Sequence, residues 1–446
     1  LNLGNIPLRS VERQESDPLI IVGGPCAYNP EPLADIVDVV VLGEGEEVLI
    51  ELMDRYRAWK QRGDSKRNFL EEIVDIEGIY VPSFYDVTYH EDFTIKSIRP
   101  KSGHYPNQIT KRIMKDLNDA YYPKKAIVPF IDVVHNRAVV EIFRGCSRGC
   151  RFCQAGMIYR PVRERSAGCV DHLADALLNS TGYEELSLSS LSTSDYSELE
   201  PLILKLMKKH GDKKVAISLP SLRLDSFSWE IIEEIQKVRK TGLTFAPEAG
   251  TQRLRDVINK GITEEDLMKA VEKAFHLGWN NVKLYFMIGL PTETYEDLDG
   301  IVDLAYKVVD LYYQVPKEKR GKGFNVTVST SSFVPKPFTP FQWQPQETIP
   351  ELQKKQDYLK RNLRHKNIKY NYHDAPASFL EAVFARGDRR LGEVLIKAWE
   401  QGCKFDGWKD FFCYEKWSRA FESCGIDPYF YANRERSYEE ILPWDH

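Results

Sequence analysis

Short apolar runs alternate with amphipathic segments along the chain from residue 138 onward. Six runs have the length and composition of buried strands, at residues 138–143, 185–189, 214–219, 242–246, 282–288 and 324–333. Helical periodicity fills the intervals, at residues 170–179, 196–209, 229–237, 264–277 and 295–311. Thr263 and Thr294 each precede a helix and have an aspartate three residues further on, which predicts two capping boxes. The alternation predicts parallel β/α units in an α/β fold, as an incomplete barrel or a doubly wound sheet.

The N-terminal sequence has the same alternation on a smaller scale. Strand-like runs at residues 18–22 and 37–42 each lead into a glycine-containing turn, and a helix is predicted over 47–60. This order is doubly wound, but two strands do not close such a sheet, so either the sheet is small or its first half is absent from this chain. Residues 66–137 have weak signals, and the C-terminal hundred are predicted to be mainly helical and aromatic-rich. We therefore divide the chain into residues 1–65, 66–137, 138–345 and 346–446.

Charge and hydropathy narrow the class of protein. The 446 residues carry a net charge of −5, which argues against a chain that is basic throughout but permits a local basic groove. No apolar run reaches the length of a membrane span, and the first residues have no signal-peptide pattern. We therefore expect a cytoplasmic protein without membrane contact, in which the cysteines are not a disulfide framework.

Three cysteines follow the first strand of the β/α region within one short loop. Cys146, Cys150 and Cys153 have the spacing C-x₃-C-x₂-C, and the next cysteine is Cys169. Three thiolates can hold three irons of a [4Fe–4S] cluster and leave the fourth iron open, whereas an electron-transfer cluster closes all four corners with cysteine. The alternatives are three structural cysteines or a zinc site with a distant fourth ligand, although zinc sites more often have paired C-x₂-C units or Cys/His sets.

This spacing, with the aromatic Phe152 before the last cysteine, resembles the signature of the radical S-adenosylmethionine (SAM) enzymes. The resemblance implies that the three cysteines are the catalytic metal ligands and that Phe152 belongs to the cofactor site. It further implies that the open iron chelates SAM and that an electron, from a donor such as flavodoxin or ferredoxin, cleaves SAM to a 5′-deoxyadenosyl radical. The fold of that family is an incomplete (β/α)₆ barrel, which agrees with the six predicted β/α units and places the chemistry at the carboxyl ends of the strands.

Two strand ends carry the first candidate SAM contacts. Ser189 and Ser190 follow the second strand, where radical SAM enzymes often have a Gly-Gly-Glu-like motif for the SAM amino group. The alternative is a serine-rich turn that caps the next helix through Asp195. Glu248 ends the fourth strand, and the resemblance assigns it to the ribose hydroxyls, because an ionised carboxylate can accept from both. The alternative is a surface glutamate near a helix N-terminus.

Arg223 and Gly289 complete the candidate cofactor site. Arg223, after the third strand, is assigned to the SAM carboxylate, with an exposed salt bridge as the equal alternative. Gly289 opens a Gly-Leu-Pro-x-Glu-Thr turn like that of several radical SAM families, where the strand lies beside the adenine. A glycine there permits close backbone approach to the ring.

Two basic segments suggest an anionic partner. An arginine-rich stretch at residues 159–166 resembles the corresponding segment of methylthiotransferases, and a second cluster lies between Lys354 and Lys369. One hypothesis joins them into a groove for RNA or phosphate. Most charged helical faces are simply solvated, which is the favoured interpretation of the second cluster. The five cysteines outside the loop are expected to be buried apolar side chains.

The ends of the chain resemble one branch of the superfamily. The turns at residues 23–25, 29–32 and 43–46 resemble the second half of an N-terminal cobalamin-binding-type domain, and the motifs at 386–390 and 442–445 resemble the C-terminal part of the same uncharacterised branch. No Asp-x-His-x-x-Gly motif is present, so no histidine ligand for cobalt is visible and cobalamin has no ligand support. A domain that binds no cobalamin is at least as plausible as one that does.

Three functional hypotheses follow. The first is a radical SAM enzyme that modifies RNA or a ribosome-associated substrate. The second is a cobalamin-dependent radical SAM methyltransferase on the same core. The third is a non-catalytic metal-binding interaction module, which the order of Glu248 and Gly289 behind the cysteine loop disfavours. The sequence does not separate the first two.

Overall fold

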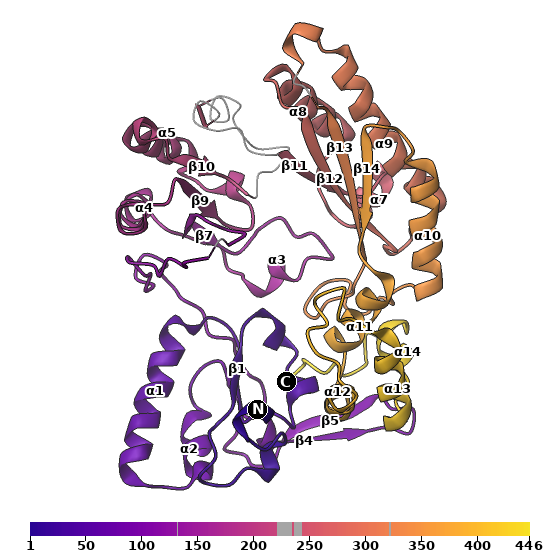
Figure 1. Cartoon of the computed structure of the whole chain (residues 1–446). Coiled ribbons are helices and arrows are strands. Elements are labelled where there is room, and N and C mark those ends of the chain that lie inside the picture. Colours follow the sequence, from indigo (N-terminus) through magenta and orange to yellow (C-terminus); the bar gives the residue numbers. More distant parts are fainter. Residues whose placement is uncertain (132, 221–233, 236–242, 321–322) are drawn as a thin grey trace. The chain divides into compact units, whose positions relative to one another are not determined.

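The computed structural model describes residues 1–131, 133–220, 234–235, 243–320 and 323–446, and these form two compact units (Figure 1). Unit 1 comprises Leu1–Met114, Val334–Thr348 and Asp374–His446, and unit 2 comprises Lys115–Phe333 and Ile349–His373. Both units are discontinuous in sequence. The first and last segments of the chain share a unit, which no local pattern indicates, and the four-part division from the sequence stays a prediction.

The strands of unit 2 confirm the β/α alternation. All six expected runs are strands, namely β6 (Ala138–Glu141), β9 (Glu185–Ser189), β10 (Ala216–Ser218), β11 (Leu243–Glu248), β12 (Asn281–Ile288) and β13 (Asn325–Ser332). They pair in parallel in two open sheets, of order β10-β9-β6 and β11-β12-β13-β14. The last strand, β14 (Ile368–Tyr372), was not predicted. Among the described residues the sheets are open and form no closed barrel.

Four helices confirm predicted intervals, namely α4 (Ala167–Thr181), α5 (Leu199–His210), α8 (Glu264–His276) and α9 (Tyr295–Gln314). The short helices α3 (Ala155–Ile158) and α7 (Gln252–Val257) were not predicted, and α10 (Ile349–Asn362) lies in the C-terminal region that was predicted to be mainly helical. Both capping boxes are confirmed, at Thr263 of α8 and Thr294 of α9, where each threonine and the aspartate three residues on satisfy one another's backbone N–H groups. The helix predicted over 229–237 lies outside the described residues apart from 234–235.

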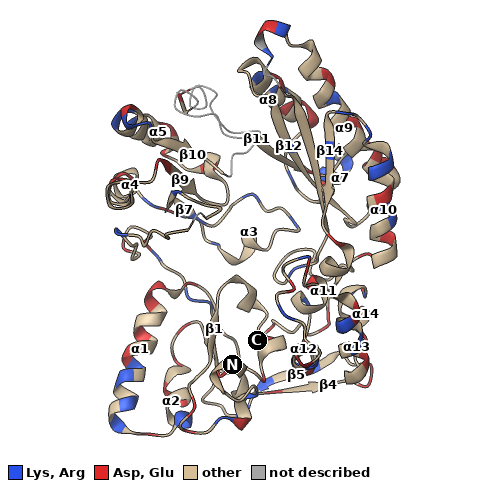
Figure 2. Ribbon diagram, in the orientation of Figure 1, with Lys and Arg blue, Asp and Glu red and all other residues tan. Residues whose placement is uncertain are grey.

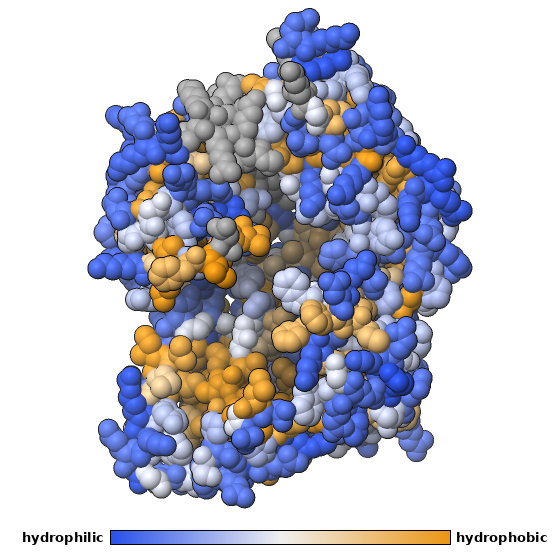
Figure 3. Space-filling view, viewed as in Figure 1, coloured by the Kyte–Doolittle hydropathy of each residue, from blue (hydrophilic) through white to orange (hydrophobic). Residues whose placement is uncertain are grey.

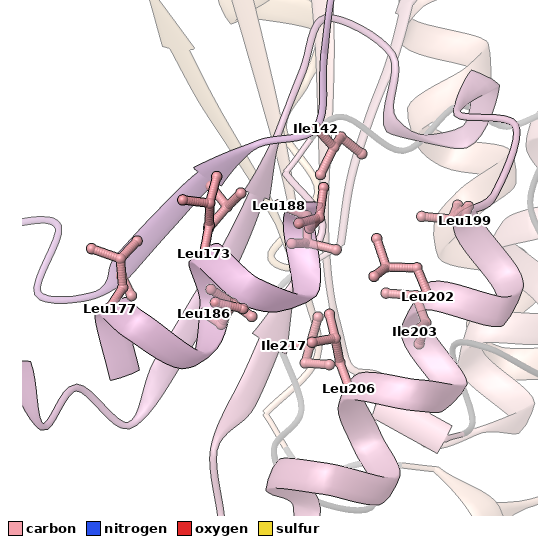
Figure 4. Packing of buried hydrophobic residues seen from close by; sticks show 14 of the residues in the cluster. Ile142, Leu173, Leu177, Leu186, Leu188, Leu199, Leu202, Ile203, Leu206 and Ile217 are labelled. Carbon is pink, nitrogen blue, oxygen red and sulfur yellow. The ribbon is translucent and has the colours of Figure 1, made fainter. Parts of the chain in front are cut away.

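A leucine-rich core joins the first sheet of unit 2 to its helices (Figure 4). Leu186 and Leu188 of β9 are at most 1% exposed, and the intervening Ser187 is also buried. Such continuous burial is typical of a parallel strand covered on both faces. Leucines of α4 and α5 pack on this strand, including Leu173 and Leu206. Each such side chain contributes about 1.5–3 kcal/mol to folding stability through burial. This packing stabilises the strands whose ends carry the candidate site.

The turn after β11 packs closely against the backbone of α9. A Cβ atom on Gly250 would lie 2.1 Å from the carbonyl oxygen of Asp297 and 2.7 Å from the carbonyl carbon of Gly300. Both are backbone atoms, so only glycine fits at position 250. Thr251 then caps α7 and donates to the Asp297 carboxylate. This contact fixes the turn that follows Glu248.

Unit 1 contains the small N-terminal sheet. Its strands are β1 (Ile21–Gly23), β2 (Val39–Val41) and β3 (Ile79–Tyr80), with β1 parallel and β3 antiparallel to β2. The predicted helix is α1 (Gly45–Arg62), and residues 66–100, where the sequence signals are weak, form α2 (Lys66–Ile73) and the hairpin of β4 (Tyr85–Tyr89) with β5 (Ile95–Pro100). Four C-terminal helices complete the unit, α11 (Ala375–Ala385), α12 (Leu391–Glu400), α13 (Tyr414–Cys424) and α14 (Pro428–Ala432).

The surface of unit 1 is mixed. Acidic side chains lie at the start of α1 and basic ones at its end, the arrangement that the helix dipole favours (Figure 2). Apolar residues gather over β1 and the start of α1 (Figure 3), where Ile21, Leu49, Ile50 and Met53 are exposed. No helix among the described residues combines the length and apolarity needed to cross a bilayer.

Candidate radical SAM site

The cysteine loop is closed at its base by backbone pairing. The strands β7 (Phe143–Arg144) and β8 (Arg163–Glu164) are antiparallel and pair Phe143 with Glu164. Gly145 has a φ of +94°, and a Cβ there would lie 2.7 Å from the carbonyl oxygen of Pro161. Only glycine suits this crossing, because the neck is tight and the backbone is left-handed. Residues 145–162 thus form a loop whose two ends lie side by side at the end of the first strand.

The three cysteines of the loop are half-buried and form no disulfide. The N–H of Gly156 donates to the sulfur of Cys153 at 3.3 Å. Burial raises the pKa of Cys153, and the neighbouring Cys146 raises it further, whereas the Gly156 N–H and the Lys260 ammonium lower it. The thiol form of Cys153 is therefore favoured in the metal-free protein, so metal binding must displace its proton.

Glu248 lies in the same site as the cysteine loop. It ends β11 with a φ of +67°, a left-handed conformation that non-glycine residues rarely adopt. Its carboxylate accepts from the Lys260 ammonium at 3.1 Å, and the two side chains are only 16% and 13% exposed. Both charges lie close enough to affect the pKa of Cys153. The turn that carries Lys260 contacts the cysteine loop, because the Asn259 side chain donates to the carbonyl of Gly149 at 2.9 Å. The structure thus adds Lys260 to the candidate site, which sequence reasoning missed.

The serines after β9 are part of a local turn. The carbonyl of Ser189 accepts from the N–H of Ile142, and the Ser190 and Thr193 hydroxyls are 3.0 Å apart. Asp195 does not cap α5, which one interpretation of the sequence predicted. Its carboxylate binds the Arg148 guanidinium of the cysteine loop, with 2.8 Å from the Arg148 Nε to Oδ2. The serine-rich turn therefore anchors the loop, while the SAM role of Ser189 and Ser190 stays a prediction, as does that of Phe152, which is half-buried between the second and third cysteines.

The Gly289 turn is held by a buried ion pair. Gly289 has a φ of +75°, and its N–H donates to Glu293 Oε1 at 2.8 Å. The same oxygen accepts from the Lys355 ammonium at 2.7 Å, and both charged side chains are almost fully buried. The turn is therefore rigid and presents a backbone without a side chain at the end of β12. Arg223, the other predicted cofactor contact, lies outside the described residues.

Three cations of the two basic segments are not available to the hypothesised groove for RNA or phosphate, and the groove itself stays a prediction. Arg163 and Arg165 are buried and donate to backbone carbonyls, those of Pro161 and Glu141 among them. Lys355 is committed to Glu293. These three cations support the loop and the Gly289 turn, because burial leaves them no access to an external phosphate.

Of the five cysteines outside the loop, all expected to be buried, one is exposed. Cys403 is buried, as predicted, and Cys169, Cys413 and Cys424 are half-buried. Cys26 is exposed, contrary to the prediction of a buried thiol, because it lies in a short 3₁₀ helix (Pro25–Tyr28) whose buried residues are Ala27 and Tyr28.

Comparisons with known proteins identify the family of the chain. Residues 1–82 match the family of radical SAM proteins, N-terminal, and residues 140–305 match the radical SAM superfamily. An uncharacterized protein of Methanocaldococcus jannaschii is 30% identical over 391 residues, which cover 87% of this chain and 75% of that protein. The ribosomal protein uS12 methylthiotransferase RimO of Petrotoga mobilis is 25% identical over 299 residues, which cover 63% of this chain and 65% of RimO. The chain belongs to the radical SAM superfamily.

Two solved radical SAM proteins align with the chain at low TM-scores. TsrM, a radical SAM methyltransferase of Kitasatospora setae solved with cobalamin and a [4Fe–4S] cluster, aligns with a TM-score of 0.49 at 14% identity over 72% of this chain and 58% of TsrM. The cobalamin-dependent enzyme OxsB aligns with a TM-score of 0.47 at 13% identity over 91% of this chain and 59% of OxsB. The chain spans less than two thirds of the length of these solved proteins.

Membership implies an enzyme that uses a [4Fe–4S] cluster and SAM, and the donor set of the loop fits the cluster. Three of the four irons of such a cluster would each take one protein thiolate, and the loop offers three thiols. One of them already accepts an N–H bond of the kind that tunes cluster sulfurs. Among the described residues, no three His, Cys, Asp or Glu side chains are gathered tightly enough to hold a single metal ion.

Proposed function

We propose that Cys146, Cys150 and Cys153 each bind one iron of the cluster and that Glu248 binds the ribose of SAM. When bound and reduced by one electron from an external donor, the cluster and SAM would supply hydrogen-abstraction chemistry through a 5′-deoxyadenosyl radical, with methionine as the other product. The observation that carries this proposal is that one turn contacts both groups: Asn259 donates to the carbonyl of Gly149 in the cysteine loop, and the next residue, Lys260, pairs with Glu248.

The Glu248–Lys260 pair is suited to a zwitterionic ligand. A ribose diol offers two hydroxyl donors to the Glu248 carboxylate, which has acceptor sites beyond the one that Lys260 occupies. When the diol competes for the carboxylate, the Lys260 ammonium becomes available to an anionic group such as the SAM carboxylate, beside the role predicted for Arg223. The rigid turn at Gly289 provides a flat backbone surface for the adenine.

We propose a ribosome-associated protein or RNA as the substrate, with a flavodoxin- or ferredoxin-type electron donor in the cytoplasm. The support is the similarity to RimO, which acts on ribosomal protein uS12 according to its name. Cobalamin-dependent methyl transfer is the second candidate, favoured by the match of residues 1–82 to an N-terminal radical SAM domain and by a 23% identical uncharacterized methyltransferase of Pyrococcus horikoshii.

The proposed function is tested with the full chain under anaerobic conditions. After reconstitution with iron and sulfide, the protein is mixed with SAM and dithionite, and 5′-deoxyadenosine and S-adenosylhomocysteine are quantified. We expect 5′-deoxyadenosine that depends on both iron loading and reductant. S-Adenosylhomocysteine together with a corrinoid absorption band would favour the methyltransferase. A loaded cluster that yields neither product, in the presence of ribosomes, would contradict the proposal.

The role of Glu248 makes a separate prediction. In Glu248→Gln the charge is lost while the shape is kept, so we expect SAM to bind the reconstituted protein about tenfold more weakly, with iron content unchanged. Anaerobic calorimetric titration with SAM measures this. The matched control is Glu264→Gln, since Glu264 forms an exposed pair with Lys307 in the same unit. If Glu248→Gln and Glu264→Gln bind SAM with equal affinity, Glu248 does not contribute to SAM binding.

A further inference from the structure

The cysteine loop is held on two sides by residues far from it in sequence. On the side of β9, Arg148 makes a two-point ion pair with Asp195, which Ser192 also holds at 2.7 Å. On the side of β11, the N–H of Arg151 donates to the carbonyl of Ile258 at 3.0 Å, and its guanidinium donates to the carbonyl of Val257. The non-cysteine residues of the motif therefore fasten the loop to both sheets of unit 2.

Asn259 makes the most specific of these contacts. Its side-chain Nδ2 donates to the carbonyl of Gly149 at 2.9 Å and reaches that of Arg148 at 3.4 Å. Two carbonyl acceptors require an NH₂ group, so no acceptor side chain can replace it. Asn259 has a φ of +54°, a left-handed conformation in which asparagine is among the few tolerated side chains. Gly149 has a φ of +74°, and a Cβ there would lie 3.4 Å from the Asn259 Nδ2.

The position of Asn259 connects the loop to the candidate ligand site. The next residue is Lys260, which pairs with Glu248. The short turn after α7 therefore makes two contacts. Asn259 binds the peptide between Cys146 and Cys150, and Lys260 is the cation that binds Glu248. A shift of this turn moves both groups together, since the two residues are covalent neighbours.

We infer that Asn259 is a positioning residue that sets the geometry of the cysteine loop for the cluster and couples that geometry to the Glu248–Lys260 pair. The inference rests on the proposed function for the identity of the cluster. The hydrogen bonds from Asn259 to the cysteine loop are present in the metal-free chain. Residues of this kind, which orient the metal-binding groups without touching the metal, commonly change metal affinity by about 10- to 100-fold when they are replaced.

The test compares Asn259→Asp with Asn281→Asp. Aspartate keeps the size of asparagine and its tolerance of the left-handed backbone, but it places an acceptor against two carbonyls. Asn281 is an exposed asparagine whose amide donates only to its neighbour Asn280. Asn259 is itself exposed, so neither substitution disturbs the core. The variant Asn259→Gly removes the side chain and still permits the backbone conformation.

Two measurements are made on the full chain. In metal-free protein, we expect alkylation of Cys146, Cys150 and Cys153 to be about fivefold faster in Asn259→Asp and Asn259→Gly than in wild type, with hydrogen exchange of peptide 146–153 raised in parallel. In reconstituted protein, we expect iron loss to a chelator to be about tenfold faster and the EPR signal of the reduced cluster to change shape. Asn281→Asp should behave as wild type in both.

Wild-type rates in both Asn259 variants would overturn the inference. So would equal changes in Asn281→Asp, because these would indicate a general loosening of unit 2. The alkylation and exchange measurements need neither cluster nor SAM. They therefore decide the role of Asn259 even if the wild-type protein cleaves no SAM, a result that would count against the proposed function alone.

Discussion

Alanine at any one of Cys146, Cys150 and Cys153 is expected to abolish 5′-deoxyadenosine formation from SAM. A [4Fe–4S] cluster with only two protein thiolates exposes a second iron and is lost readily, because the loop contains no fourth cysteine to take its place. The measurement is iron and sulfide content after reconstitution, followed by product quantification under dithionite. We expect iron to fall well below four per chain in each variant, and the product to fall to the level without protein.

The matched control is Cys169→Ala. Cys169 is half-buried in the first turn of α4, in the same unit and outside the loop, and is expected to retain full iron content and activity. Thermal unfolding distinguishes a lost ligand from a lost fold, since none of the three loop cysteines is fully buried and their replacement by alanine leaves the leucine-rich core intact. If the Cys150→Ala variant forms as much 5′-deoxyadenosine as the wild type, the cysteine loop does not take part in SAM cleavage.

The order of β/α units could be predicted because it depends on local pattern. Apolar runs of strand length and the capping boxes at Thr263 and Thr294 are encoded by residues within a few positions of one another, and both were confirmed. The cysteine loop was found for the same reason, since its spacing is a local signal. The strand β14 (Ile368–Tyr372) was missed although its five residues alternate between apolar and polar, because the run is short and its lysine was counted with the basic segment between Lys354 and Lys369.

The supporting residues of the site could not be predicted, because their roles depend on contacts across the fold. Asp195 looked like a helix cap and instead binds Arg148. The turn containing Asn259 and Lys260 follows an ordinary helix, and its one sequence signal, an Asn-Lys-Gly turn, is typical of any helix end. Lys355 lies in what looked like a solvated basic face, yet its partner Glu293 comes from 62 residues away.

The C-terminal Arg386–Arg390 segment illustrates the same point in unit 1. The sequence suggested family resemblance without a role. In the structure, Arg389 binds Glu31 with its Nε 2.8 Å from Oε2, and Glu31 is fully buried. The hydroxyl of Tyr80 donates to the other oxygen of Glu31 at 2.7 Å. The segment therefore ties the last hundred residues of the chain to the first hundred through a buried, hydrogen-bonded charge pair.

Removal of Arg389 is therefore expected to cause a large loss of stability in unit 1. In Arg389→Met the Glu31 carboxylate stays buried, with the Tyr80 hydroxyl still hydrogen-bonded to it and the His446 ring 3.9 Å away. Breaking a buried pair in this way costs about 3–5 kcal/mol. Hydrogen exchange in segments 79–85 and 386–392 of the full chain measures the local opening free energy, which suits a chain of two units because global unfolding need not be two-state.

The double variant Glu31→Gln with Arg389→Met separates an unpaired charge from lost packing. If the unpaired carboxylate dominates, the double variant recovers a large part of the stability that Arg389→Met loses, because no buried charge remains. The control is Arg67→Met, which breaks an exposed pair with Glu71 and is expected to change stability by no more than about 0.5 kcal/mol. An Arg389→Met effect as small as that of Arg67→Met would mean that the pair does not hold the two ends of the chain together, and that apolar packing of α12 on the N-terminal segment does so instead.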